Sequence, residues 1–119
     1  MGVTVTKELV WDSANSRYEL DMAEWDYAVI QIIQQAGYNI EFKSTNDGGA
    51  VTGSVDDSGL TALNSYSILA QDLSDGTFVS STTTLLGLYK ITDFGRYILL
   101  NTSQKPKATI IKAMLYKFG

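Results

Sequence analysis

Carboxylates are the side chains in this sequence that are best placed to do chemistry. Asp56 and Asp57 are adjacent, and Glu41 lies six residues before Asp47. Two carboxyl groups held about 5 to 10 Å apart can hydrolyse a glycosidic bond. However, thirteen acidic residues will produce such pairs by chance, and the chain has no histidine or cysteine to act as base or thiol nucleophile. We therefore expect a protein that is not an enzyme.

Two acidic loops offer oxygen ligands of the kind that calcium accepts. They contain Asn46 and Asp47 in one loop and Asp56 and Asp57 in the other. Neither loop has the spaced multi-carboxylate pattern of a dedicated calcium site, so we predict no metal and no cofactor. The same four residues are our candidates for a binding loop.

Composition and charge exclude several kinds of partner. Nine basic and thirteen acidic side chains give a net charge of −4, which argues against binding to nucleic acid. No apolar run approaches the roughly 18 residues of a spanning helix, and the first residues lack a signal-peptide pattern. We expect one domain over residues 1–119, made in the cytoplasm and not bound to a membrane.

The charge is unevenly divided along the chain. Residues 1–60 carry ten acidic and three basic groups (−7), whereas residues 61–119 carry three and six (+3). Either the two halves interleave in one fold, or an acidic and a basic patch meet head to tail between copies of the chain.

Alternating apolar residues and regularly spaced turns predict an all-β fold. Turn residues recur every eight to twelve positions, a spacing typical of a β-sandwich or barrel. We predict an antiparallel, jelly-roll-like sandwich of about eight strands. Residues 27–33 and 38–45 are expected to form a hairpin that reverses at Gly37 with a positive φ. The other expected strands cover residues 3–11, 17–20, 65–73, 77–84, 85–92, 96–101 and 108–118.

The last predicted strand has more apolar surface than one core can use. One face carries Ile111, Ala113 and Leu115, and a strand of a two-layer sandwich normally exposes its other face to water. That second face is also mainly apolar, with residues Ile110, Lys112, Met114, Tyr116 and Phe118. It is covered either by a loop or the N-terminal segment of the chain, or by a neighbouring subunit. In the second case these five residues form the interface of a homo-oligomer such as a trimer.

Four short motifs resemble a β-sandwich domain that recurs in the virion proteins of tailed phages. The matching positions are Phe42, Ser44 or Thr45, Asp47, Gly48 and Gly49; then Thr84, Gly87 and Tyr89; then Gly95, Arg96 and Tyr97; and finally Ala108 to Ile110. The resemblance spans roughly residues 25–118. The chain departs from the family pattern at Ala50 and Val51, where an aromatic residue is common, and at Leu99, where an arginine is common.

This resemblance implies a virion structural protein that is located on the capsid. A chain that consists almost entirely of this domain suits a decoration or auxiliary protein that binds the major capsid protein and stabilises the shell. The alternative is a carbohydrate-binding or receptor-binding module of a tail or head fibre, which would present residues 46–59 and 71–83 to a glycan.

Overall fold

The computed structural model describes residues 2–13, 16–46, 65–102 and 109–118, and these residues form strands and connections without a helix. The strands are β1 (Val3–Glu8), β2 (Trp11–Asp12), β3 (Arg17–Asp21), β4 (Tyr27–Gln34), β5 (Ile40–Thr45), β6 (Tyr66–Ser67), β7 (Ala70–Asp72), β8 (Phe78–Val79), β9 (Ser81–Thr82), β10 (Leu86–Ile91), β11 (Tyr97–Asn101) and β12 (Thr109–Lys117).

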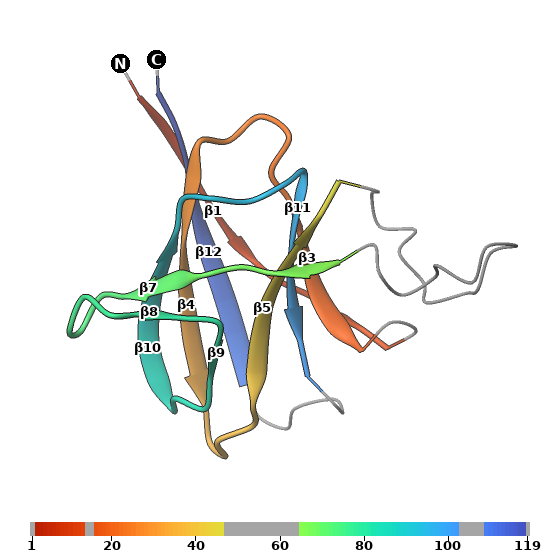
Figure 1. Ribbon diagram of the computed structural model, residues 1–119, viewed down its shortest axis with the longest axis vertical. Helices are drawn as coiled ribbons and strands as arrows, with labels where there is room; N and C mark the ends of the chain where they lie inside the picture. The colour runs from red at the N-terminus through yellow and green to blue at the C-terminus, as the bar shows by residue number, and fades with distance from the viewer. Residues whose placement is uncertain (1, 14–15, 47–64, 103–108, 119) are drawn as a thin grey trace, which may run out of the picture.

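The strands form two sheets packed face to face (Figure 1). Sheet A has the order β1-β12-β4-β10-β7-β8, and sheet B has the order β2-β3-β11-β5-β6 with β9 also paired to β5. Every recorded pairing is antiparallel. The predicted antiparallel β-sandwich is therefore confirmed, with twelve strands among the described residues rather than about eight in all, while the jelly-roll likeness stays a prediction.

The core lies between the inner faces of the two sheets. Strand β4 shows most clearly why the core lies there, because its residues are alternately half-buried and buried from Tyr27 to Gln34. Successive side chains of a strand point to opposite faces, so Ala28, Ile30 and Ile32 all enter the core. They meet Phe42 and other inner residues of sheet B in one cluster of buried side chains.

The predicted hairpin between residues 27–33 and 38–45 is wrong. Strand β4 pairs with β10 and β12 in sheet A, whereas β5 pairs with β6, β9 and β11 in sheet B. The connection through Gly37 therefore crosses from one sheet to the other. A Cβ atom at Gly37 would lie 2.9 Å from the carbonyl oxygen of Thr83, so glycine is needed there for close packing. Among the described glycines the positive φ belongs to Gly76, at 79°.

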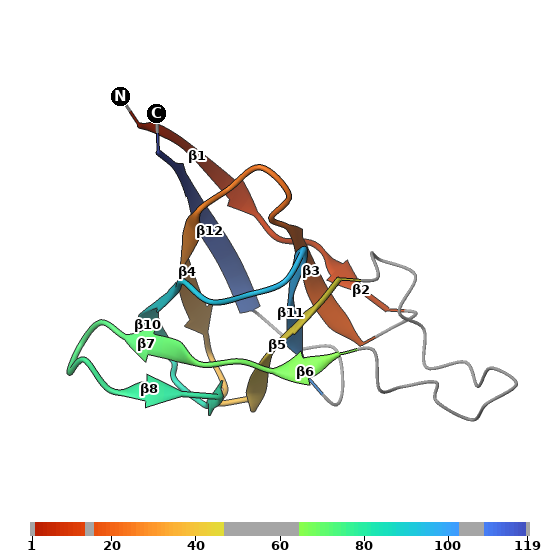
Figure 2. The same ribbon diagram turned by 45° about the horizontal axis from the view of Figure 1, so that its top comes forward.

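Three segments predicted as single strands each change sheet partway. Residues 3–11 are divided between β1 in sheet A and β2 in sheet B. Residues 65–73 are divided between β6 in sheet B and β7 in sheet A, and residues 77–84 between β8 in sheet A and β9 in sheet B. Figure 2 shows β6 and β7 as one green path that runs from one sheet to the other. These changes of sheet account for most of the additional strands.

Candidate functional site

The outward-facing side of sheet A, which we call the outer face, carries exposed apolar residues. In β12 the fully buried residues Ile111, Ala113 and Leu115 alternate with Ile110 and Met114, which are 43% and 38% exposed. Ile110 pairs with Ile33 of β4, and Met114 pairs with Val29. Paired residues of antiparallel strands point to the same side of a sheet, so the apolar surface continues from β12 onto β4.

Strand β10 extends this outer face with two more leucines. Leu86 pairs with Ile33 and Leu88 pairs with Gln31, and they are 70% and 45% exposed. Beyond β10, the exposed Leu73 donates its backbone N–H to the carbonyl oxygen of Leu88. The apolar surface therefore spans at least three strands of sheet A.

An aromatic cluster occupies one end of the outer face. The rings of Tyr27 and Tyr116 are stacked with their centroids 4.4 Å apart, and the Phe118 ring is 5.8 Å from that of Tyr27. The ammonium of Lys90 lies 4.7 Å from the centroid of the Tyr27 ring, within cation–π range. The Tyr116 hydroxyl donates to the Met114 sulfur at 2.7 Å. These contacts fix the rings in place while Phe118 remains largely exposed.

Two shallow hollows in the outer face meet at Gln31 and Leu88. One has a volume of about 390 Å³ and is also lined by Leu73, Leu86 and Gly87. The other has a volume of about 240 Å³, with lining residues Thr6, Val29, Gln31, Leu88, Lys112, Met114 and Tyr116. The outer face is thus mostly apolar and has two shallow hollows rather than a flat surface, with Lys112 beside Met114 and Tyr116.

The structure places the five predicted interface residues together. Ile110, Lys112, Met114 and Tyr116 share the outer face, and Phe118 follows the end of β12, where its N–H donates to the Asp26 carboxylate. Sequence reasoning missed Leu86 and Leu88, although their alternation with Tyr89 and Ile91 was a usable signal. That this surface is an interface stays a prediction.

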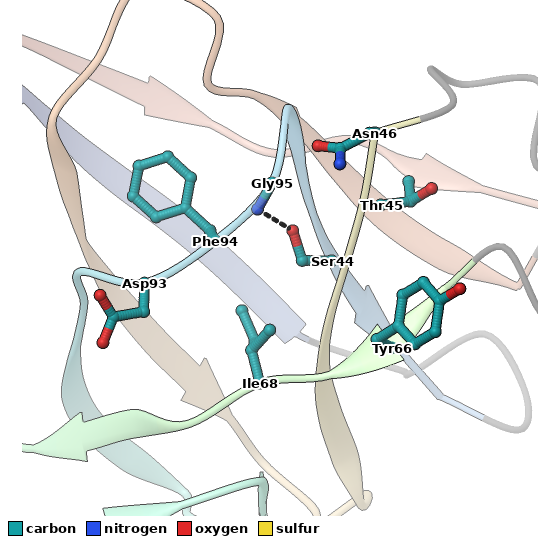
Figure 3. Close-up of a pocket in the computed structure, with 8 residues that line it drawn as sticks. All are labelled: Ser44, Thr45, Asn46, Tyr66, Ile68, Asp93, Phe94 and Gly95. Atoms are coloured by element: carbon teal, nitrogen blue, oxygen red, sulfur yellow. Dashed lines mark hydrogen bonds between the residues drawn. The ribbon is translucent and has the colours of Figure 1, made fainter.

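A further hollow, the Ser44 pocket, lies where β5 meets the turn between β10 and β11 (Figure 3). It has a volume of about 310 Å³, and its lining residues are Ser44, Thr45, Asn46, Tyr66, Ile68, Asp93, Phe94 and Gly95. The Ser44 hydroxyl accepts from the Gly95 N–H at 2.6 Å and donates to the Tyr97 carbonyl at 2.7 Å. The Arg96 N–H donates to the Asn46 side-chain oxygen at 2.9 Å.

These hydrogen bonds join two of the motifs that carry the resemblance to phage virion domains. A Cβ atom at position 95 would lie 2.5 Å from the Asn46 side-chain oxygen and 3.1 Å from the Thr45 carbonyl oxygen, so a larger residue would displace Asn46 and crowd the end of β5. In the motif of Thr84, Gly87 and Tyr89, a Cβ at Gly87 would lie within 3.1 Å of Thr84 and Tyr89 side-chain atoms. The motif positions described by the structure therefore maintain packing.

Of the four predicted binding-loop residues, the structure describes Asn46. It lies at the rim of the Ser44 pocket and supports the backbone of Arg96. Asp47, Asp56 and Asp57 lie outside the described residues, so a shared binding loop stays a prediction. Within the described ranges, no group of three or more acidic, histidine or cysteine side chains is arranged to hold a metal ion. The same residues include no helix that could cross a membrane.

One exposed ion pair links β3 to the turn before β11. The Arg96 guanidinium donates to both oxygens of the Asp21 carboxylate, at 3.2 and 3.3 Å. The hydrogen bond from Arg96 is the main cause of a lowered pKa for Asp21, and the Ala23 N–H, which donates at 2.9 Å, lowers this pKa further. The ion pair fixes Arg96, a motif residue, beside sheet B.

Comparisons with known proteins show the fold. No family model and no curated protein matches the sequence. The SPBc2 prophage-derived protein YomS aligns with a TM-score of 0.70 and 10% identity over 98% of this chain and 96% of YomS. The PBSX exported protein XepA aligns with a TM-score of 0.69 and 14% identity over 98% of this chain and 38% of XepA. The chain therefore has the β-sandwich architecture found in these two prophage-encoded proteins.

Proposed function

We propose that this protein is a non-enzymatic structural protein of a phage, an auxiliary or decoration protein that binds and stabilises the capsid. The observation that carries the proposal is the exposed apolar outer face of sheet A. Monomeric proteins seldom expose a continuous apolar surface of this kind unless it contacts a partner. The fold shared with two prophage-encoded proteins and the resemblance to virion domains support a phage context.

The charges of the two sheets support association as the mode of action. The strands of sheet A contain four basic and two acidic residues, whereas those of sheet B contain two basic and four acidic residues. Lys90 and Lys112 lie on the outer face of sheet A itself. The apolar groups would supply binding energy, and the lysines would steer the face towards an acidic surface on the capsid or on another copy of the chain.

The proposal can be tested by placing a charge in the outer face. Met114→Lys and Leu88→Lys each introduce an ammonium at an outward-facing position, so the fold should survive. Val10→Lys is the matched control, because Val10 is an 81% exposed apolar residue between β1 and β2. We would measure self-association by light scattering after size exclusion, and capsid binding by co-sedimentation with heads of the encoding phage.

We expect the wild type and Val10→Lys to associate. Met114→Lys and Leu88→Lys should each associate at least tenfold more weakly. Buried lysine without a partner costs enough free energy to produce such a loss. A wild type that neither self-associates nor binds heads would contradict the proposal, as would lysine variants that bind as well as the wild type.

A further inference from the structure

We propose that the Ser44 pocket binds one neutral sugar unit of a glycan. This inference goes beyond the proposed structural function, because it concerns a different surface and a different class of ligand. The outer face belongs to sheet A. The pocket is instead formed by β5 and β6 of sheet B, by Ile68 next to β6 and by the turn before β11 (Figure 3).

The apolar side of the pocket suits the flat face of a pyranose. Tyr66 is 68% exposed, and in Figure 3 its ring lies at one side of the pocket, with Asp93 and Phe94 at the opposite side and Ile68 between them. Ile68 and Phe94 are half-buried and pack against the core, so they form a fixed apolar wall. An exposed ring with an apolar body and a polar tip can stack on a sugar and also hydrogen-bond to it.

Asp93 is the charged group that decides the class of ligand. Asp93 is exposed and is one of the lining residues, and its carboxylate accepts no hydrogen bond from another described residue. Sugar hydroxyls are donors, and a hydrogen bond from a hydroxyl to a carboxylate is about twice as strong as one between neutral groups. The other lining residues are uncharged, so no cationic side chain of the lining offsets the repulsion between Asp93 and an anionic ligand.

A sugar fits this arrangement better than an organic cation does. Cation recognition through aromatic rings relies on a cage of several exposed ring faces. Here Tyr66 is the exposed ring, while Phe94 is half-buried in the wall. The volume of about 310 Å³ is at the small end of the range for ligand pockets, which favours a single sugar unit over a longer segment.

The polar rim of the pocket is held in place before any ligand binds. Ser44 uses its hydroxyl both to accept from Gly95 and to donate to Tyr97, and Asn46 holds the N–H of Arg96. These bonds fix the turn that carries Asp93 and Phe94. A preformed site avoids the entropy cost of ordering a loop, which matters for a ligand that makes few contacts.

The experiment is an NMR titration of the ¹⁵N-labelled full chain with methyl glucoside, N-acetylglucosamine and glucuronate. We expect saturable shifts centred on the amides of Tyr66, Asp93 and Gly95, with a millimolar Kd for at least one neutral sugar. Glucuronate should bind at least fivefold more weakly. Tyr66→Ala and Asp93→Asn should each weaken binding of the neutral sugar at least fivefold, whereas Tyr66→Phe should retain most of it.

Two control variants test whether the response belongs to this pocket. Phe78→Ala removes an exposed ring from β8, and Glu41→Gln removes an exposed carboxylate from β5, both outside the pocket lining. Both should bind the sugar as the wild type does. The ¹⁵N spectrum of each variant also shows directly that it is folded.

Three results would overturn the proposal. They are the absence of saturable shifts with either neutral sugar, shifts that Tyr66→Ala leaves unchanged, and a response to tetramethylammonium without a response to sugar. The last result would assign the pocket to a cation instead.

Discussion

The outward-facing sides of the two sheets differ in how exposed their apolar residues are. On sheet A the outward-pointing residues include Leu86, Leu88 and Ile110, all substantially exposed. On sheet B, Leu99 pairs with Glu19 on one side and Lys43 on the other, yet it is 0% exposed. Arg17 of the same face is also buried, at 4%.

This contrast teaches that alternation in the sequence does not reveal which outward-facing residues are free to bind. Leu88 and Leu99 both occupy outward positions in central or near-central strands, but the first is 45% exposed and the second is fully enclosed. Only the exposed leucine is available to a partner. The argument for an association surface on sheet A therefore depends on exposure, and the following predictions test that difference.

The largest expected effect comes from shortening the two leucines. Leu99→Ala should lower the free energy of unfolding by about 2–5 kcal/mol, because it removes fully buried methyl groups and leaves a cavity. Leu88→Ala should lower it by less than about 1 kcal/mol, because the side chain is already partly hydrated. Urea denaturation of both variants at pH 7 would measure the difference. Equal losses would mean that the two faces are not distinct in the way described.

A smaller effect is expected from the basic residues of the two faces. Arg17 lies 3.1 Å from the Glu19 carboxylate, and its side chain is 5% exposed, whereas that of Glu19 is 25% exposed. Arg17→Ala should cost about 1–3 kcal/mol, because it removes a packed aliphatic stem and leaves a partly buried carboxylate. Lys112→Ala on the exposed face is the matched change and should stay within about 0.5 kcal/mol. Denaturant unfolding of the purified monomers measures both, and a Lys112 effect as large as that of Arg17 would contradict the comparison.

The smallest effect concerns the exposed ion pair at the edge of sheet B. The lowered pKa of Asp21 means that its carboxylate stabilises the fold at pH values above its unfolded pKa of about 3.9. This contribution is lost as the pH falls from about 4 through the lower pKa of the folded state. Since both side chains are about half exposed, Asp21→Asn should cost less than about 1 kcal/mol at pH 7.

The measurement is the difference in unfolding free energy between the wild type and Asp21→Asn at pH 7 and near pH 2. That difference should shrink at the lower pH, whereas Glu24→Gln, a nearby exposed control, should have little effect at either. A difference that grew on acidification would show that the sign assigned to Asp21 is wrong.

The sequence was sufficient to predict most strand positions and the inner faces of β4 and β12, because these depend on local alternation, but it did not predict that three segments divide between the sheets. Ala28, Ile30 and Ile32 illustrate this, as do Ile111, Ala113 and Leu115, which all lie in the core. The partner of each strand was harder to predict. A hairpin and a crossover between sheets can have the same turn residues, and Gly37 is compatible with both.

Of the two candidate surfaces, one could be predicted from the sequence and the other could not. Ile110 and Met114 were predicted to point away from the core because alternation alone determines it. The Ser44 pocket was not predictable, since Ser44 and Gly95 are 51 residues apart in the chain and meet only in the folded structure. Pairings of this kind depend on the whole arrangement of strands.

The position of β12 has a consequence for the order in which the molecule folds. This strand separates β1 from β4 in sheet A, and its residues pair with Val3–Glu8 at the other end of the chain. During synthesis β1 has no partner in its sheet until β12 has left the ribosome. Non-local closure of this kind slows folding and leaves strand edges exposed meanwhile. Sheet A therefore cannot be completed before β12 is available, and a nascent chain without β12 should be prone to aggregation.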